Sequence, residues 1–265
     1  MKDRILENLP ASYPWKSQFH WFDTVGSTND LLKAMARQGV PHGTVALSGH
    51  QTAGRGRMGR SFHSPAGMGI YLSLLLRPNT LPEELMHLTC ATAIAVCDAV
   101  QTAVGIRPGI KWTNDLVHDR RKLGGILTEL GFGTNGRVEY AIIGVGLNCC
   151  QQSSDFPEDL QDMAVSLEMA AGHSVDCAQI AASMMNALYR MSLDLKDGKA
   201  DALRRYRQDC ITIGQEVSIL RGDEVHHDTA LDVDENGALV VRFPDGCVQT
   251  VNSGEVSIRG MYGYL

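Results

Sequence analysis

The chain has 265 residues, enough for one large domain or for a large domain and a small one. Acidic residues number 30 against 24 lysines and arginines, so the formal net charge is -6. This charge repels nucleic acid and argues against a polyanion-binding surface. The seven cysteines are odd in number and lack metal-site spacing, which argues against a disulfide framework and predicts reduced thiols.

The N-terminal segment contains no apolar stretch of signal-peptide length. The apolar runs later in the chain are shorter than a membrane span requires. We therefore expect a cytoplasmic protein that does not enter a membrane.

In chain order, the first predicted element is a short helix over 31–39, which follows a polar cluster at 26–30. Strands are predicted over 44–48 and 69–76, where apolar and β-branched residues gather. These two strands flank a loop of glycines and arginines at 54–60.

A largely buried helix is predicted over 85–104, because this segment is rich in Ala and Leu and lacks Gly and Pro. Three short strands are predicted next, over 109–112, 123–130 and 138–147. Repeated short strands around one long helix predict a layer of helices on a mixed or antiparallel sheet.

Helical spacing of apolar residues recurs over 176–195, and a second helix follows Gly198. After Cys210 the pattern changes to brief β-like segments separated by turn-forming residues. Strands this short and regularly spaced predict a small β-barrel. We place the domain boundary here, with a large domain at 1–211 and the barrel domain at 212–265.

The loop at 54–60 reads Gly-Arg-Gly-Arg-Met-Gly-Arg. Its glycines let the backbone bend around an anion, and its guanidinium groups form charge-assisted hydrogen bonds. Because the whole chain is acidic, we interpret the loop as a local site for a small phosphorylated ligand. The alternative is a solvated Gly/Arg turn.

Four polar segments interrupt the apolar sheet pattern, at 27–29, 51–60, 111–115 and 120–125. Taken together and in this order, they resemble the bacterial biotin protein ligases. The resemblance rests on GSTN (26–29), QTAGRGRMGRSFHSPAG (51–67), IYLSLLLRP (70–78), KWTNDL (111–116), RKLGGILTE (121–129) and GVGLN (144–148).

The resemblance implies an α+β fold, with a class II aminoacyl-tRNA-synthetase-like mixed or antiparallel sheet and helices, plus a small C-terminal SH3-like β-barrel. It also implies a two-step ligase reaction. Biotin and ATP first give biotinyl-5′-AMP and pyrophosphate, and a lysine of a biotin carboxyl carrier domain then takes the biotinyl group. Domain 1–211 would bind both substrates, and Mg²⁺ would be carried in by ATP, without a metal site of the protein's own.

By the same resemblance, three residues carry the chemistry. Lys122 would contact the biotin carboxylate and stabilise the charge that develops at the acyl group. Arg55 would neutralise the α-phosphate as part of a lid over the adenylate. Asp115 would orient or deprotonate the incoming lysine. For Lys122, the alternative is a lysine in a solvated turn.

Biotin's ureido ring offers two N–H donors and one acceptor, so small hydroxyl and amide groups suit it. Residues 27–29 are also expected to cap the following helix. The resemblance assigns biotin binding to Ser27, Thr28, Asn29, Gln51, Arg55, Gly56, Arg57, Lys122 and Gly124. It assigns nucleotide binding to Arg57, Arg60, Phe62, Lys111, Asn114 and Asn148.

The sequence departs from the family pattern in two places. Thr113 stands where relatives commonly carry proline, and Phe62 with His63 stands where a tryptophan often follows the loop. Phe62 keeps an aromatic face for biotin or the adenylate, while His63 leaves the adenine contact open. Glu255 and Arg259 match polar positions of the family's last domain.

Two other functions stay open. A lipoate or octanoate protein ligase shares the fold and the transfer to lysine, although the Gly/Arg segment favours biotin. A nucleic-acid-binding module would use the loop for phosphates, but it leaves Lys122 unexplained. Because the ligase pattern starts within the first thirty residues, we expect no N-terminal DNA-binding domain. A monomer and a homodimer are both compatible with the sequence.

Overall fold

The computed structural model describes residues 1–221, 224–252 and 257–260. Seven strands form a central sheet in which β1 pairs with β2 in parallel and the other neighbouring pairs are antiparallel. The predicted mixed sheet is therefore confirmed. In spatial order the strands are β1 (Phe19–Phe22), β2 (Val45–Ser48), β3 (Gly69–Leu76), β7 (Val138–Asn148), β6 (Arg121–Phe132), β5 (Asp115–His118) and β4 (Gly109–Lys111).

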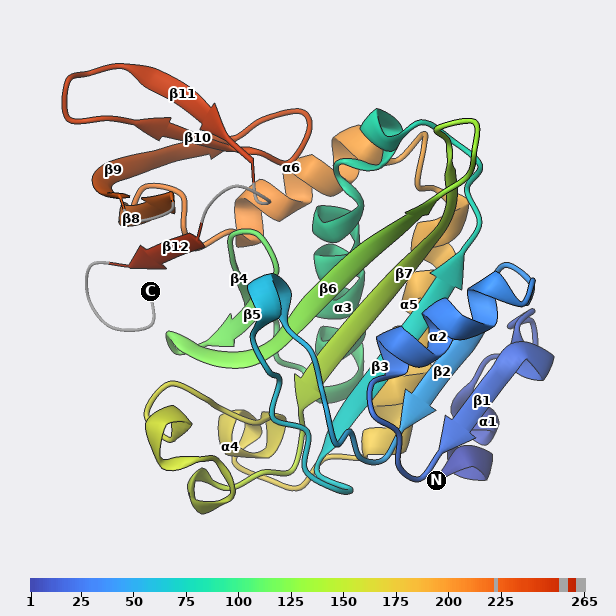
Figure 1. Cartoon of the computed structure of the whole chain (residues 1–265). Helices are drawn as coiled ribbons and strands as arrows, with labels where there is room; N and C mark the ends of the chain where they lie inside the picture. The colour runs from blue at the N-terminus through green and yellow to red at the C-terminus, as the bar shows by residue number, and fades with distance from the viewer. Residues whose placement is uncertain (222–223, 253–256, 261–265) are drawn as a thin grey trace.

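Helices cover both faces of this sheet (Figure 1). On one face, α2 (Thr28–Arg37) contacts β2, β3 and β7. On the other face, α3 (Leu88–Val104) and α5 (Cys177–Leu193) pack against each other and against the sheet. The remaining helical segments include α1 (Lys2–Asn8) on α5, α6 (Lys199–Asp209) on α3, α4 (Leu167–Ala171), and 3-10 turns at Lys16–Gln18, Arg57–Gly59, Pro82–Leu85, Ser153–Asp155 and Glu158–Leu160.

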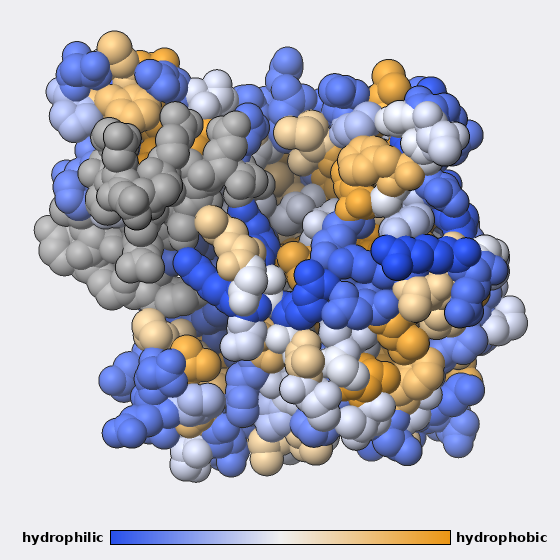
Figure 2. Space-filling view, in the orientation of Figure 1, coloured by the Kyte–Doolittle hydropathy of each residue, from blue (hydrophilic) through white to orange (hydrophobic). Residues whose placement is uncertain are grey.

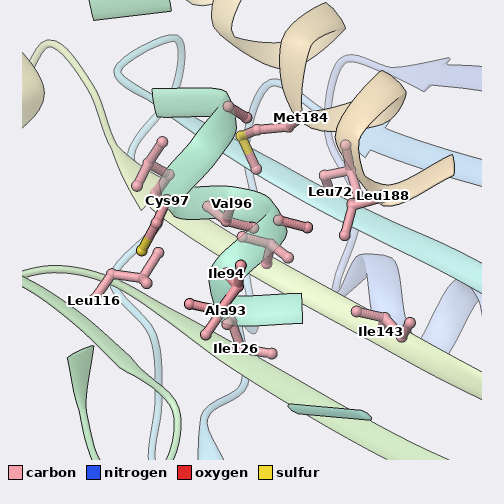
Figure 3. Close-up of a cluster of buried hydrophobic side chains, with 14 of the residues drawn as sticks. Leu72, Ala93, Ile94, Val96, Cys97, Leu116, Ile126, Ile143, Met184 and Leu188 are labelled. Carbon is pink, nitrogen blue, oxygen red and sulfur yellow. The ribbon is translucent and has the colours of Figure 1, made fainter. Parts of the chain in front are cut away.

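The main hydrophobic core lies between the sheet and the pair α3 and α5 (Figure 3). Successive strand residues point to opposite faces of a sheet. Leu72 and Ile143 therefore join this core, while their chain neighbours Ser73 and Gly144 face α2, where Asn29 contacts both positions. The same two strands thus build the core on one face and a polar surface on the other.

Helix α3 and the turn before it form the segment Pro82–Val104, which is long and apolar enough to cross a membrane by length and composition alone. In this protein 67% of its most apolar window is buried inside the fold. Val96 and Cys97, for example, are both 0% exposed. The segment packs here as the central helix of the core.

A second, smaller sheet follows α6. Its five strands are antiparallel to their neighbours, which confirms the predicted separate all-β part at the C-terminal end. Glu255 and the side chain of Arg259 lie outside the described residues. In spatial order the strands are β11 (Val248–Val251), β10 (Leu239–Arg242), β9 (Glu224–Val233), β8 (Glu216–Arg221) and β12 (Ser257–Gly260).

The sequence patterns missed α1, β1 and β5, and they predicted α3 three residues too early. Strand β5 has only four residues and carries polar residues at both ends, so its period of two is not visible in the sequence. Its extended conformation comes from pairing with β4 and β6. The start of α3 shifts to Leu88 because Pro82–Leu85 forms a separate 3-10 turn.

The core predicts a contrast between two leucines of α5. Leu188 is 1% exposed and Leu193 is 69% exposed. Leu188→Ala removes buried methyl groups and leaves a cavity, so we expect it to lower the free energy of unfolding by about 2–5 kcal/mol. Leu193→Ala is the matched control and should change it by about 0.5 kcal/mol or less. Chemical denaturation followed by circular dichroism measures both; equal effects would contradict this core assignment.

Candidate active site

A cavity of about 540 Å³ lies on the α2 side of the central sheet. Figure 2 views this face, and strongly hydrophilic residues cross its middle. The walls come from the start of α2, the loop of glycines and arginines at 54–60 (the basic loop), the connection between β4 and β5, and strands β6 and β7. All four polar segments meet there, and the predicted site residues that line the cavity are Ser27, Thr28, Asn29, Gln51, Arg55, Gly56, Arg57, Arg60, Phe62, Lys111, Asn114, Asp115 and Lys122.

Gln51 caps the start of α2. Its Oε1 accepts hydrogen bonds from the Thr28 backbone N–H at 2.9 Å and from Thr28 Oγ1 at 3.1 Å. Its Nε2 donates to Ser64 Oγ at 3.1 Å. Ser27 occupies the N-cap position, but its side chain makes no capping hydrogen bond, so the capping role expected for it is wrong. Gln51, from a different segment of the chain, accepts the hydrogen bond from the free backbone N–H at the start of the helix instead.

The Asn29 side chain packs directly against the backbone of β7, because residue 144 is a glycine. A Cβ at residue 144 would stand 2.2 Å from Asn29 Oδ1. The buried Ser73 donates to Asn29 Oδ1 at 2.6 Å, and Asn29 Nδ2 donates to Glu129 Oε2 at 2.8 Å. Ser73, Glu129 and Gly144 were missed in the sequence. Nothing about an isolated serine or glutamate in a strand shows which face it occupies.

Arg55 joins the basic loop to α2 and β6. Its guanidinium forms an ion pair with Asp30 and a second one with Glu129, at 3.2 Å. Lys33 also pairs with Glu129 and lies 3.6 Å from Asp30. Two cations and two carboxylates therefore form one network at this edge of the cavity. The Arg55 guanidinium points to protein carboxylates, which does not favour a nucleic-acid-binding face.

The loop itself is hydrogen-bonded across its base. The Gly56 N–H donates to the Arg60 carbonyl at 2.7 Å, and the Phe62 N–H donates to the Gly54 carbonyl at 2.9 Å. Met58, at its tip, is 62% exposed and has a φ of 54°, in the left-handed region. The loop is thus a compact turn that projects over the cavity.

A second charged cluster lies deeper, where β5 meets β6. Lys122 Nζ donates to Asp115 Oδ1 at 2.7 Å. Arg57 Nη1 donates to Asn114 Oδ1 at 3.0 Å, and Asn114 Nδ2 donates to the Ile126 carbonyl at 3.0 Å. The side chains of Lys122 and Asp115 are 30% and 18% exposed. The loop arginine, the amide, the carboxylate and the lysine therefore converge at one end of the cavity.

Burial lowers the pKa of the Arg57 guanidinium, and the nearby Asp115 carboxylate acts in the opposite direction. Desolvation makes the positive charge costly unless an anion or an acceptor faces it. Arg57 is thus a partly desolvated cation whose charge can be matched further by an anionic ligand.

Two predicted site residues lie outside the cavity. Gly124 points to the opposite face of the sheet, and Gly125 faces the site; a Cβ there would be 3.4 Å from Asp115 Oδ1. Asn148 is 5% exposed and donates to the carbonyls of Lys122, at 3.4 Å, and Val165, at 3.2 Å. Asn148 therefore supports the backbone of Lys122.

Phe62 covers β7 at a second glycine. A Cβ at residue 146 would lie 2.5 Å from Phe62 Cε1, so only glycine allows this packing. Phe62 also meets Tyr71 edge to face, with ring centroids 6.4 Å apart. The aromatic side chain that replaces the family's tryptophan thus forms part of the cavity wall.

The connection between β4 and β5 is held from outside the cavity. The indole N–H of Trp112 donates to the Gly237 carbonyl at 2.9 Å, and the buried Tyr206 hydroxyl donates to the Thr113 carbonyl at 2.9 Å. The Thr212 hydroxyl accepts a hydrogen bond from the backbone N–H of Trp112 at 2.9 Å. Trp112 is therefore a core residue that anchors this segment to α6 and the C-terminal sheet.

Two family models match the chain. Residues 21–148 match the "Biotin/lipoate A/B protein ligase family", and residues 212–259 match the "Biotin protein ligase C terminal domain". The first range contains the cavity lining except for Met163.

Known proteins show the same relationship. The bifunctional ligase/repressor BirA of Bacillus subtilis is 32% identical over 90% of this chain and 73% of that protein. The biotin–[acetyl-CoA-carboxylase] ligase of Mycobacterium tuberculosis is 32% identical over 87% of this chain and 85% of that protein. The structure of the biotin protein ligase from Aquifex aeolicus in complex with biotin and ATP superposes with a TM-score of 0.79, at 27% identity, over 91% of this chain and 98% of the other. This chain belongs to the biotin protein ligase family.

Proposed function

We propose that this protein activates biotin with ATP to form biotinyl-5′-AMP and then transfers biotin to a lysine of a biotin carboxyl carrier domain. One observation carries the proposal: Lys122 and Arg57 converge with Asp115 in a single cavity of substrate size. The relatives favour biotin over lipoate, since two that this chain covers to 85% and 98% of their length are named biotin–[acetyl-CoA-carboxylase] ligases.

The biotin ring would occupy the part of the cavity near the start of α2. Thr28, Asn29 and Gln51 offer hydroxyl and amide groups there, and the backbone at Gly144 leaves room beside them. A ureido ring needs both donors and acceptors, which this mixture provides. Ser73 would act indirectly, by fixing the orientation of the Asn29 amide.

Adenylation brings the biotin carboxylate to the α-phosphate of ATP, and these two anions repel each other. Lys122 and Arg57 would hold both anions, because their positive charges lie at the same end of the cavity. Asp115 orients the Lys122 ammonium through the 2.7 Å hydrogen bond. Arg60, Lys111, Asn114 and Phe62 also line the cavity, and they would contact the nucleotide.

Mg²⁺ fits this proposal as an ion bound to the ATP phosphates. Among the described residues, no group of three or more His, Cys, Asp or Glu side chains is placed to hold a metal ion. Asp115, the carboxylate in the cavity lining, is already paired with Lys122. The protein would therefore bind the metal through its nucleotide and not through a carboxylate cage.

Transfer of biotin requires the carrier lysine to lose a proton before it attacks the mixed anhydride. Asp115 would attract this ammonium to the cavity and accept or orient its proton. The basic loop would exclude water from the adenylate until the carrier arrives, with Arg55 and its two carboxylate partners as the anchor of the lid.

We further propose a catalytic domain at 1–211 and a small domain at 212–265. The family model for the C-terminal domain begins at residue 212, and β8 begins at Glu216. The bonds from Trp112 to Thr212 and Gly237 support a structural role for the small domain in holding the β4–β5 connection.

An activation assay tests the proposed function directly. With ATP and Mg²⁺, biotin should release pyrophosphate and form biotinyl-5′-AMP, and lipoate should not. Addition of a biotin carboxyl carrier domain should then give a biotinylated carrier lysine. Lipoate-dependent pyrophosphate release, or nucleic-acid binding without ATP turnover, would reject the proposal.

Lys122→Ala should slow biotin adenylation by about 10²–10³-fold, because the reaction loses a cation aimed at the developing charge. The free energy of unfolding of this variant should stay close to that of the parent protein. Lys196→Ala, at an exposed lysine away from the cavity, is the control and should adenylate biotin at the parental rate. Normal biotinyl-5′-AMP formation by Lys122→Ala would remove this residue from the mechanism.

Gly144→Ala should raise the KM for biotin and reduce kcat/KM by about 10–100-fold, since the new methyl group displaces the Asn29 side chain from the sheet. The KM for ATP should stay near the parental value. Gly26→Ala is the matched control, because a Cβ at residue 26 meets nothing within 4 Å. Steady-state pyrophosphate release gives both constants, and an unchanged KM for biotin would place the biotin ring elsewhere.

A further inference from the structure

Three cysteines meet at the junction of β7 and α5, outside the proposed active site. Cys149 and Cys150 directly follow the last residue of β7, and Cys177 is the first residue of α5. The Sγ atoms of Cys150 and Cys177 lie 3.3 Å apart, although 27 positions separate them in the chain. A disulfide has an S–S distance of about 2.0 Å. The two sulfur atoms are therefore a small displacement away from a covalent bond.

The three thiols differ in access. Cys149 is 0% exposed, while Cys150 and Cys177 are partly exposed. A small oxidant would therefore reach the outer pair more easily than Cys149. The Sγ atoms of this outer pair lie 3.3 Å apart, and the Cys149 thiol also interacts with Cys177.

Cys177 has the environment of a reactive thiol. It opens a 17-residue helix whose N-cap, Asp176, accepts hydrogen bonds from the next turn. The pKa of the Cys177 thiol is lowered to about 7, first by a hydrogen bond with Cys149 and also by one with Cys150. Burial and the negative charges of Glu168 and Asp176 act in the opposite direction. Burial raises the pKa of Cys150. Cys177 would thus act as the nucleophile, and Cys150 would be the thiol that resolves the oxidised form.

We propose that Cys150 and Cys177 form a peroxide-sensitive thiol pair that closes to a disulfide. In the first step, the Cys177 thiolate attacks one oxygen of hydrogen peroxide, the O–O bond breaks, and the released hydroxide takes a proton to leave as water. Cys177 is now a sulfenic acid. In the second step, the Cys150 sulfur attacks the Cys177 sulfur, the S–S bond forms, and a second water leaves with the hydroxyl group and the Cys150 proton. Two thiols are oxidised, and one peroxide is reduced to two waters.

The Cys150–Cys177 disulfide would form at a point where several segments of the chain meet. The backbone N–H groups of Cys149 and Cys150 both donate to the Met68 carbonyl, at 3.1 and 2.8 Å, where the chain returns from the basic loop to β3. The Glu168 N–H donates to the Cys149 carbonyl at 2.9 Å. The disulfide would therefore attach α5 covalently to the point where the end of β7, the loop return and α4 already meet. This chemistry does not depend on the proposed ligase reaction.

Peptide mapping of the full-length protein tests the pair. After treatment with hydrogen peroxide, we expect two fewer alkylated cysteines and a peptide in which Cys150 is linked to Cys177, both reversed by dithiothreitol. Residues 151–176 contain no Lys or Arg, so a protease that cleaves after acidic residues is needed to separate the two cysteines. A Cys149–Cys177 link, a disulfide between chains through the exposed Cys247, or full alkylation of both thiols would overturn the proposal.

Two single variants separate the roles of the thiols. In Cys150→Ser, Cys177 should stop at the sulfenic acid and be labelled by a dimedone probe after peroxide treatment. In Cys177→Ser, neither the label at this site nor the linked peptide should form. Cys247→Ser is the control and should still form the Cys150–Cys177 disulfide. Far-ultraviolet circular dichroism checks that each variant is folded, and labelling of Cys150 in Cys177→Ser as strongly as Cys177 in Cys150→Ser would reverse the assigned roles and contradict the proposal.

Discussion

The cavity exists because β6 and β7 lack side chains at three positions on one face. Gly125, Gly144 and Gly146 lie where a Cβ would meet the Asp115–Lys122 pair, Asn29 and Phe62. On the other face of the same strands, Ile126, Ile143 and neighbouring apolar residues pack against α3 and α5 (Figure 3). A strand places successive side chains on opposite faces, so these segments alternate between core and site. The packed core therefore holds the strands, and with them the site residues, in fixed positions.

Three cations of the cavity, Arg55, Arg57 and Lys122, have partners before a ligand enters. Arg55 pairs with two carboxylates, Lys122 with Asp115, and Arg57 with the Asn114 amide. A partly buried charge is costly unless it is matched, and each charge-assisted hydrogen bond contributes about 1.5–3 kcal/mol. Under the proposed function, phosphate and carboxylate groups would replace or extend these contacts. The protein carboxylates and the Asn114 amide would then keep the two arginines and the lysine oriented while the cavity is empty.

The positions of these charges also depend on the last quarter of the chain. The segment from Trp112 to Asp115 carries Asn114 and Asp115 of the second charged cluster. Hydrogen bonds join its Trp112 to Gly237 and its Thr113 to Tyr206. The same segment has Thr113 where relatives commonly carry proline. Hydrogen bonds from α6 and the C-terminal sheet hold this short connection in place. The small C-terminal sheet is therefore part of what positions the site.

Local patterns in the sequence determined the strongly periodic elements, namely β3, α3, α5 and the change to short strands after Cys210. The spaced blocks of glycine, arginine and lysine also determined the family and most of the residues that line the cavity. Local patterns could not show β5, because four residues with polar ends become a strand only by pairing with their neighbours.

The tertiary structure alone decided which side of each strand faces the cavity. Gly125, and not Gly124, lines the cavity, and Asn148 lies outside it and donates to the Lys122 carbonyl. Gln51, and not Ser27, bonds to the start of α2. The tertiary structure also brought Asp30, Ser73 and Glu129 to the site. Ser73 and Glu129 lie within the family motifs, but nothing in these motifs shows which face of the sheet their side chains occupy. The physical reason is that strand register and the pairing of segments distant in the chain set these contacts. The local sequence around each residue determines neither of them.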